Sequence, residues 1–385
     1  MIRNILYVHS TAEIGGADVC LLRLVSALDG KRFRAVVVTP KAGPLTEAMT
    51  GAGATVLIEP SMMRLTTQMG WRYLLRYVAH YPRAVWRLAK IIRRERIDLV
   101  HSNTLHALHG FAAAWLTRAP HVWHIREIVM QSRWMRRLEV LLARTFSKRI
   151  VAMSDAIAAM IGRTPRLTVV RDGIDLRRFH PHNDGTEVRR ALNLGADDAV
   201  AGVVCRLDHW KGVDVFLRAA ALCRAAVPNA KFVVAGGAIE GRDDLPAALF
   251  ALAETLGIRD AVRFTGWDYG PDSMPALHAA LDVLVLPSTW PEPFGLVLIE
   301  AMASGRPVIA TRHGGPVEIV ADGETGLLVE PGHAGQLAEA MTALMSDRAR
   351  RERMGCAARA RAEREFDEAR SIAAVHRIYD EVLES

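Results

Sequence analysis

Short apolar runs recur along the chain, and most are followed by a longer segment with the period of a helix. In the first half, these runs occupy residues 5–8, 35–39, 55–58, 98–101, 121–124 and 149–152. In the second half, they occupy residues 200–204, 231–235, 261–265, 281–286, 307–310 and 326–329. Continuous apolar runs of this kind are typical of strands covered on both faces of a parallel sheet. Their alternation with helices predicts a doubly wound α/β fold.

Two domains are expected, because 385 residues are more than one ordinary core holds. Polar stretches at residues 171–175 and 180–185 interrupt the alternation and predict a linker. We therefore predict doubly wound domains at residues 1–175 and 185–370. Two such domains that face each other would leave a central cleft at the carboxyl ends of both sheets, where ligands bind in open α/β sheets.

The stretch PEPFGLVLIE, residues 291–300, contains two glutamates eight positions apart, directly after an apolar run. Its two prolines cannot donate to a strand ladder, so Glu292 is predicted to lie in a strand-to-helix loop. Glu300 is predicted to lie inside the helix that follows. A helix N-terminus at this point would attract an anion, although one loop glutamate and one solvated glutamate would fit the same pattern. The free amides would be those of Phe294, Gly295 and Leu296.

Three other segments place glycines or polar side chains after predicted strands. Gly15 and Gly16 would let a ligand approach the backbone at a helix N-terminus, but the full G-x-G-x-x-G fingerprint is absent. Arg206 and Lys211 lie on one loop and together suit a pyrophosphate. His124 ends a strand, which favours a place at the ligand-binding edge of a sheet. Taken singly, these segments equally fit a tight turn, two solvated cations and a structural histidine.

The sequence contains no pattern that indicates a metal site or a disulfide framework. It has no D-x-D motif and no carboxylate cluster at metal spacing, so we expect neither a divalent ion nor another cofactor. The cysteines are scattered and form no C-x-x-C pair, which favours a reducing compartment. The first apolar run is too short for a signal peptide, and no apolar stretch reaches about 18 residues. We therefore expect a cytoplasmic protein.

Positive charge is concentrated in the first half of the chain. Residues 1–180 hold 28 Lys and Arg against 12 Asp and Glu, whereas the remaining residues hold 21 against 30. Residues 71–94 interleave arginines with large apolar side chains, as an interfacial helix does, and residues 133–137 could extend this surface. Pro82 is expected to break or kink this helix. We expect an anionic membrane surface as a partner, although a helix packed on the sheet with a solvated arginine face would fit too.

In their order and spacing, these motifs resemble the retaining glycosyltransferases of family 4, which have the GT-B fold of two Rossmann-like domains. The resemblance extends over nearly the whole chain, and it is specific to the superfamily rather than to a donor or an acceptor. The matching features are Gly15–Gly16, His124, the linker at 171–175, Arg206 with Lys211, and the E-x7-E motif of Glu292 and Glu300. The resemblance further implies that the residues from about 371 to 385 pack back on the first domain.

The resemblance implies a role for each matching residue. Glu300 would bind the ribose of the nucleotide, Arg206 and Lys211 the pyrophosphate, and Glu292 and His124 would lie by the transferred sugar. The amides of Phe294, Gly295 and Leu296 would hold sugar hydroxyls and phosphate, and those of Gly15 and Gly16 would face the phosphate or the acceptor. Outside the core pattern, Trp267 is a candidate for the nucleobase pocket or for simple packing. Candidates for acceptor contacts are Asn103, Thr104, Arg126 and Glu127.

We therefore expect a retaining, metal-independent glycosyltransferase that moves a hexose from a nucleotide sugar to a lipid-linked or other polysaccharide-precursor acceptor. A UDP-sugar is the first expectation for the donor and GDP-mannose the second, and the enzyme would lie on the inner face of the plasma membrane. The alternatives are a nucleotide-sugar epimerase of the same fold, an NAD-dependent oxidoreductase, and a non-catalytic nucleic-acid-binding protein. No nucleic-acid-binding motif occurs, so a nucleic-acid partner is not expected.

Overall fold

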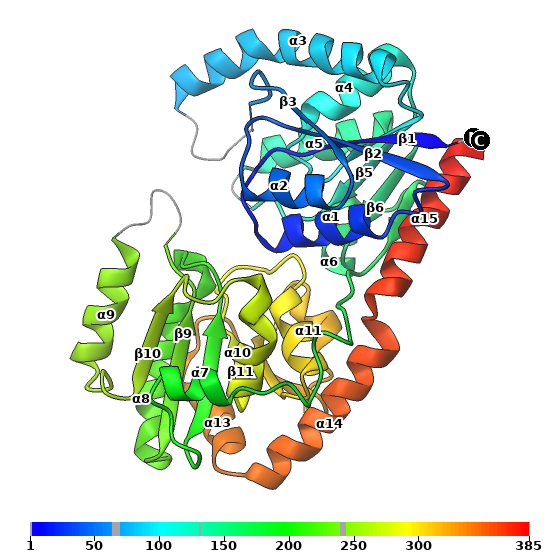
Figure 1. Ribbon diagram of the computed structural model, residues 1–385. Helices are drawn as coiled ribbons and strands as arrows, with labels where there is room; N and C mark the ends of the chain where they lie inside the picture. Colours follow the sequence, from blue (N-terminus) through cyan, green and yellow to red (C-terminus); the bar gives the residue numbers. More distant parts are fainter. Residues whose placement is uncertain (1, 64–69, 131, 239–243, 385) are drawn as a thin grey trace. The chain divides into compact units, whose positions relative to one another are not determined.

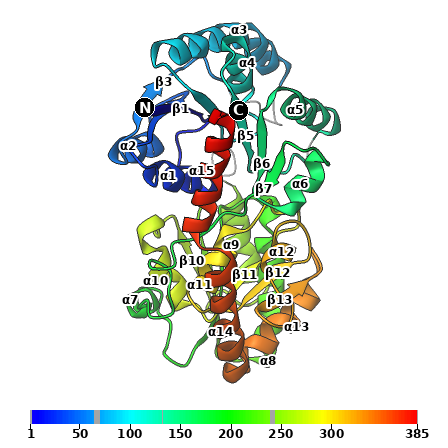
Figure 2. The same cartoon turned by 90° about the vertical axis from the view of Figure 1, so that its right-hand side faces the viewer.

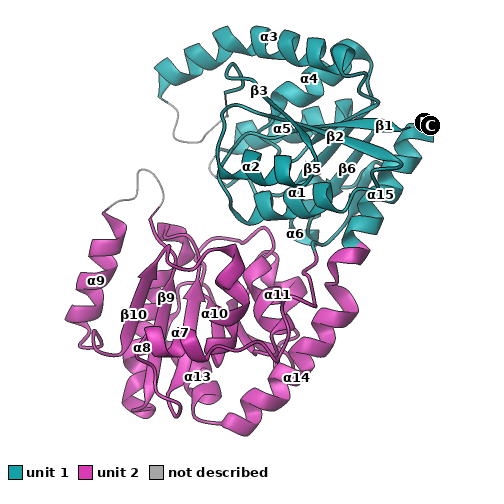
Figure 3. Cartoon of the chain, in the orientation of Figure 1, with its two compact units in different colours: residues 1–172, 371–385 teal, residues 173–370 magenta. Residues whose placement is uncertain are grey.

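The chain forms two compact units, each built around one parallel sheet (Figure 3). The structure is a computed structural model that describes residues 2–63, 70–130, 132–238 and 244–384. The first unit contains residues 1–172 together with residues 371–385, and the second contains residues 173–370. The last residues of the chain therefore belong to the same unit as the first.

The strands of the first unit form one parallel sheet (Figure 1). It has seven strands in the order β3-β2-β1-β4-β5-β6-β7. Their bounds are β1 (Arg3–Val8), β2 (Phe33–Thr39), β3 (Thr55–Ile58), β4 (Leu99–Ser102), β5 (His121–Ile125), β6 (Arg149–Ala152) and β7 (Leu167–Val169). In the registers of β1, Val8 lies beside Val38 of β2 and Ser102 of β4. Because every pairing is parallel, all these strands end at one edge of the sheet.

Helices cover both faces of the first sheet. Their bounds are α1 (Gly16–Ser26), α2 (Pro44–Gly51), α3 (Trp71–Arg94), α4 (Leu108–Thr117), α5 (Arg133–Phe146), α6 (Asp155–Ile161) and α15 (Glu368–Glu384). Ile5 and Tyr7 of β1 share one core with α1, α2 and α15, whereas Leu6 and Val8 share another with α3 and α4. Successive side chains of a strand point to opposite faces of the sheet. The sequence of a strand that is buried on both faces is therefore a continuous apolar run.

The second unit repeats this plan with six parallel strands in the order β10-β9-β8-β11-β12-β13. The strands are β8 (Ala199–Val204), β9 (Ala230–Ala235), β10 (Val262–Gly266), β11 (Val283–Leu286), β12 (Val308–Thr311) and β13 (Gly326–Val329). The helices are α7 (Thr186–Ala191), η1 (His209–Lys211), α8 (Val213–Ala226), α9 (Leu245–Thr255), η2 (Pro271–Ser273), α10 (Met274–Ala280), α11 (Leu296–Ala303), α12 (Pro316–Ile319), α13 (Ala334–Met345) and α14 (Arg348–Glu365). Helices α8, α9 and α13 share one core with the strands. Helix α11 packs on β11 and β12.

Two local expectations differ from the structure. Pro82 does not break α3, which continues from Trp71 to Arg94. Side chains on both sides of the proline are buried: Tyr77 packs on His109 of α4, and Ala84 belongs to the core shared with β1 and β2. This packing outweighs the lost backbone hydrogen bond. Most of the polar stretches at residues 171–175 and 180–185, which predict a linker, belong to the second unit, because that unit begins at Gly173. They are attached there partly because Ile174 forms a bridge with Asp367.

Helix α15 ties the end of the chain to the first sheet (Figure 2). The Tyr379 side chain is fully buried, and its Oη lies 3.3 Å from Oη of Tyr7 and 2.8 Å from Nδ1 of His101. At the surface, Arg32 pairs with Asp380 at 2.5 Å. The core of the first unit is therefore completed by residues from the far end of the sequence.

None of the helices in the described ranges is at once long and apolar enough to cross a membrane. Helix α3 is long, but its arginines keep it far too polar to span.

Candidate functional site

The residues predicted to carry chemistry lie at the carboxyl ends of strands in both units. In the first unit, β1 leads to Gly15–Gly16 and β4 leads to Asn103; in the second, β8 leads to Lys211 and β11 leads to Glu292. In each sheet, these two strands are neighbours at the point where the strand order reverses. Such a point leaves a crevice outside the carboxyl ends of the strands, where open α/β sheets bind ligands.

Lys211 and Glu292, predicted from separate motifs, form an ion pair in the second unit. Nζ lies 2.6 Å from Oε1, and the two side chains are only 14% and 6% exposed. Ser288 Oγ donates to the same carboxylate oxygen at 2.5 Å. The Lys211 ammonium also lies 4.1 Å from the ring centroid of Trp210. Because both charges are largely withdrawn from water, each depends strongly on the other.

The loop that carries Glu292 ends at the N-terminus of α11. Gly295 caps this helix with φ of 118°, a conformation that favours glycine. The loop packs backbone to backbone on the loop after β12, because a Cβ at Gly314 would lie 2.3 Å from the Glu292 carbonyl oxygen. The amides of Phe294, Gly295 and Leu296 have no hydrogen-bond partner among the described residues. Together with the positive end of the helix, these amides form an arrangement that suits an anion.

Glu300 lies one turn into α11, and its carboxylate contacts α10. Oε2 of Glu300 lies 3.2 Å from Nε2 of His278, which is fully buried. The other ring nitrogen of His278 has no partner within the described parts of the chain. His278 has no sequence signal of its own, because it lies inside α10 and follows no strand end.

Among the predicted donor-binding residues, Arg206 and Trp267 have exposed side chains. Arg206 follows β8, and its side chain forms neither a hydrogen bond nor an ion pair with any described residue. Trp267 follows β10, and its Nε1 donates to the Ala238 carbonyl at 3.1 Å. Its indole lies against Gly237, where a Cβ would come within 2.5 Å of Nε1. The ring is therefore fixed by packing on one side and open on the other.

In the first unit, Asp18 organises the glycine loop. Its Oδ2 accepts from the Gly15 amide at 2.7 Å, and its Oδ1 lies 2.5 Å from His9 Nε2 and 3.0 Å from Thr11 Oγ1. Burial raises the pKa of Asp18, but the hydrogen bonds from these three residues outweigh burial and hold that pKa below its usual range. The Gly15 amide is therefore engaged within the loop, whereas the Gly16 amide has no partner among the described residues.

The four predicted acceptor contacts form a hydrogen-bonded network. Nε of Arg126 donates to Asn103 Oδ1 at 2.8 Å, and its guanidinium pairs with Asp172. The Glu127 carboxylate accepts from the Thr104 hydroxyl. Of the four predicted side chains, only that of Glu127 is partly exposed. The network therefore fixes the loops that follow β4 and β5 and leaves one carboxylate at their surface.

His124 lies on β5, one residue before the end of the strand, and is almost fully buried. Neither of its ring nitrogens has a partner among the described residues. Its ring stacks edge-on against His101 at a centroid distance of 5.4 Å. Burial lowers the pKa of His124 well below its usual value, and the charge of Arg126 lowers it further. The imidazole is therefore neutral near pH 7 and could donate one hydrogen bond and accept another.

In the described ranges, no group of three or more His, Cys, Asp or Glu side chains is placed to hold a metal ion. The residues that the sequence analysis missed are second partners of predicted ones. Asp18 and Ser288 belong to this class, as does Asp172 within the predicted linker. Asp18 and Ser288 contact residues within nine and four positions of themselves, through loops that no local pattern describes. Asp172 lies 46 positions from Arg126, so its role depends on a distant segment.

Two family descriptions match the chain, one for each unit. "Glycosyltransferase Family 4" matches residues 14–178, and "Glycosyl transferases group 1" matches residues 184–361. Among curated proteins, the lipopolysaccharide core biosynthesis mannosyltransferase LpsB of Rhizobium meliloti is 34% identical over 60% of this chain and 68% of its own length. A D-inositol 3-phosphate glycosyltransferase of Corynebacterium urealyticum is 33% identical over 74% of this chain and 66% of its own length.

Among solved structures, HepE of Anabaena in complex with UDP and glucose is similar over both units. Its TM-score is 0.85 at 26% sequence identity, covering 98% of this chain and 100% of HepE. The chain spans about half the length, from 44% to 47%, of several further D-inositol 3-phosphate glycosyltransferases that it matches.

Proposed function

The chain belongs to the glycosyl transferases of group 1 and family 4, and we propose that it moves a hexose from a nucleotide sugar to a lipid-linked or polysaccharide-precursor acceptor, with retention of configuration. The first donor proposed is a UDP-sugar, a choice supported by the UDP and glucose in the HepE structure. The second is GDP-mannose, because LpsB is a mannosyltransferase.

The observation that carries this proposal is the cluster at the carboxyl edge of the second sheet. There the buried Lys211–Glu292 pair lies beside the free amides at the start of α11. We assign the pyrophosphate to Lys211, the exposed Arg206 and the positive end of α11, which together compensate its charge without a metal ion. We assign the ribose hydroxyls to Glu300, because a carboxylate can accept from both. The proposal includes no metal ion or other cofactor.

For the chemical step, we assign Glu292 and His124 to the transferred sugar. The neutral His124 imidazole, whose nitrogens have no partner among the described residues, would exchange hydrogen bonds with sugar hydroxyls. The bond from the anomeric carbon to the diphosphate breaks as a bond to the acceptor oxygen forms on the same face. The acceptor proton passes to the leaving phosphate oxygen. Glu292 stabilises positive charge at the anomeric carbon, and Lys211 and Arg206 stabilise the leaving diphosphate.

We assign the acceptor to the carboxyl edge of the first sheet. The Gly16 amide has no partner among the described residues there. The Glu127 carboxylate is partly exposed, although it already accepts from Thr104 and from the amides of Leu105 and Arg126. Asn103, Thr104 and Arg126 would support this surface from below, because their polar atoms are engaged in the network with Glu127 and Asp172.

We also propose that the first unit rests on an anionic membrane at the inner face of the plasma membrane. Helix α3 exposes Trp71, Leu75 and Val78, which are 69%, 61% and 60% exposed. At about 100° per residue, these three side chains project within about 60° of one another, and Arg72 and Arg76 follow on one side at about 60° and 100° from Leu75. The helix contains no acidic residue. An apolar stripe flanked by arginines suits the headgroup layer of an anionic bilayer.

The donor assignment is tested by thermal unfolding with UDP, GDP, ADP, NAD and a short DNA duplex, with chelator present throughout. One nucleoside diphosphate at about 100 times its dissociation constant is expected to stabilise the protein by about 2.7 kcal/mol. Lys211→Ala and Glu300→Ala should each remove most of this effect, whereas Arg353→Ala, an exposed cation on α14, should not. Stabilisation by NAD or duplex alone would contradict the assignment.

The reaction and the membrane part need separate experiments. Incubation of the donor alone distinguishes an epimerase, which would convert it without an acceptor, and NMR of the anomeric proton reports retention or inversion in the product. Binding to vesicles with anionic lipid at low salt tests α3, and Trp71→Ser with Leu75→Ser should weaken it. If the wild-type protein does not bind such vesicles, the proposed membrane association is refuted and the transferase assignment is unaffected.

A further inference from the structure

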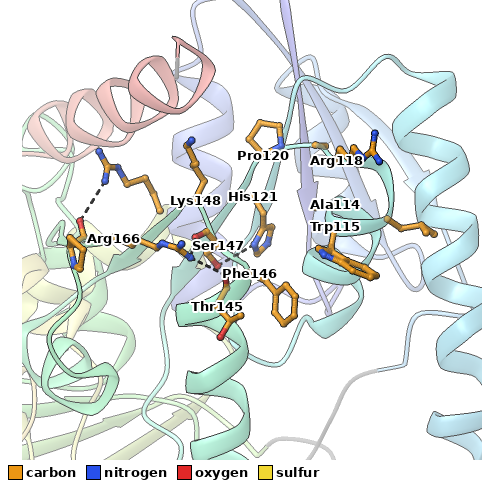
Figure 4. A pocket seen from close by; sticks show the side chains of 14 residues that line it. Ala114, Trp115, Arg118, Pro120, His121, Thr145, Phe146, Ser147, Lys148 and Arg166 are labelled. Carbon is orange, nitrogen blue, oxygen red and sulfur yellow. Dashed lines mark hydrogen bonds between the residues drawn. The ribbon is translucent and has the colours of Figure 1, made fainter.

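A pocket with a volume of about 800 Å³ lies at the amino edge of the first sheet, opposite the edge that carries Gly16 and Glu127 (Figure 4). Its walls come from the C-terminal ends of α4 and α5 and from the segments that lead into β5, β6 and β7. Figure 4 labels Trp115 and Phe146 as well as Lys148 and Arg166 along it. The pocket is therefore separate from the residues assigned to the transfer reaction.

The lining of this pocket is strongly cationic, and it includes no carboxylate among the described residues. Arg166 donates to the carbonyls of Arg144, Thr145 and Ser147 at 2.9 to 3.0 Å. These carbonyls belong to the negative C-terminal end of α5, which would repel an anion. Arg166 neutralises part of this negative charge. Arg149 is compensated by Glu381 at 3.1 Å.

The two remaining cations of the lining are Arg118 and Lys148. Both are exposed, and neither side chain has a hydrogen bond or an ion pair within the described parts of the chain. Arg118 ends α4 with φ of 60°, and Lys148 directly precedes β6. Their positive charges are therefore the uncompensated charges of the pocket.

Beside the cations, the pocket has an aromatic wall that is anchored in the core. Trp115 is 68% exposed, and its ring meets Phe146 edge-on at a centroid distance of 6.2 Å. Phe146 stacks on Phe111 at 5.4 Å, and Phe111 stacks on the buried Trp123 at 5.4 Å. Leu116 extends the exposed apolar area. Because the wall is rigid before any ligand arrives, contact with an apolar group costs little conformational entropy.

We propose that this pocket binds the phosphate group of an anionic lipid, with Arg118 and Lys148 on the phosphate and the acyl part along Trp115 and Leu116. Charge complementarity selects the phosphate. The adjoining apolar wall favours a lipid over a soluble phosphate, which would leave Trp115 in water. The site stands independently of the transfer reaction and of α3.

The test uses the full chain and vesicles of phosphatidylcholine with or without phosphatidylglycerol. Arg118→Gln combined with Lys148→Gln should weaken binding to the anionic vesicles about thirtyfold, because each cation near an anionic surface contributes about fivefold. The matched control is Arg218→Gln combined with Arg353→Gln, two exposed cations of the second unit, which removes the same charge and should change binding less than twofold. Equal weakening by both double variants would mean that net charge alone is responsible and would overturn the proposal.

A soluble probe separates the two sources of phosphate. Glycerol 3-phosphate should bind far more weakly than the vesicles, and Trp115→Ser should weaken vesicle binding while leaving glycerol 3-phosphate binding unchanged. If glycerol 3-phosphate binds as tightly as the anionic vesicles, the ligand is a soluble phosphate and the lipid assignment fails. Vesicle binding by the Arg118/Lys148 variant within twofold of wild type would overturn the site itself, whatever the α3 variants do.

Discussion

Replacing Lys211 by methionine isolates the buried ion pair of the second unit. The change keeps the length of the side chain but leaves the Glu292 carboxylate, which is 6% exposed, with Ser288 as its remaining hydrogen-bond donor. Removing one partner of a buried pair costs about 3–5 kcal/mol, because the other charge stays buried without compensation. The Ser288 hydroxyl offsets part of this, so we expect a loss of about 3 kcal/mol in the free energy of unfolding.

Native-state hydrogen exchange of the β8 and β11 amides measures this loss for the second unit alone. At about 1.36 kcal/mol per tenfold change, these amides should exchange roughly 150 times faster in Lys211→Met. In the double variant with Glu292→Gln, both charges are gone, and exchange should return to within about fivefold of wild type.

The control is an ion pair of the same unit that lies in water. Arg190 and Glu187 are 68% and 78% exposed, so Arg190→Met should cost less than about 1 kcal/mol. If Lys211→Met accelerates exchange no more than Arg190→Met, the buried Lys211–Glu292 pair contributes no more to stability than an exposed pair does. The Lys211–Glu292 pair would then not preorganise an anion site at α11.

Three further predictions concern single positions. Burial lowers the pKa of His121 to about 3. The contribution of His121 to the stability of the first unit is therefore fully present above pH 6.5 and falls by about 1.4 kcal/mol per pH unit between pH 6.5 and about 3, so His121→Asn should reduce the pH slope of urea unfolding by about that amount. Gly314→Ala adds a clash with backbone to its positive φ, so it should lower the melting temperature more than Gly332→Ala, where φ is also positive but nothing lies within 4 Å. Tyr379→Phe leaves Nδ1 of His101 unpaired and buried, which should cost the first unit about 1–3 kcal/mol in β4 hydrogen exchange without affecting the second unit.

Most strands could be predicted because both of their faces are buried. The run at residues 326–329 coincides with β13, and that at 149–152 with β6. Strand β7 (Leu167–Val169) was not predicted, since it has three residues and only partial burial, and a run so short carries no period. The continuity of α3 through Pro82 depends on packing against the sheet, which no local pattern contains.

In the candidate site, too, some features follow from the local sequence and others depend on the fold. The strand-to-helix loop of Glu292 and the helical position of Glu300 follow from local prolines and periodicity. The contact between Lys211 and Glu292, 81 residues apart, depends on β8 and β11 being neighbours, which the sequence alone does not state. Asp18 reads as an ordinary acidic residue in the first turn of a helix. Only the folded loop brings the Gly15 amide to its carboxylate.

The return of the chain to the first sheet sets an order of assembly during synthesis. The core beneath β1 includes Val375, Ile378, Tyr379 and Val382 of α15, so the N-terminal unit cannot complete this core until residue 382 has been translated. All residues of the second unit, 173–370, are translated before α15 is finished, so this unit can fold before the first unit does. A stop codon after residue 370 would therefore leave the second unit intact and expose the incomplete first unit to chaperones and proteases.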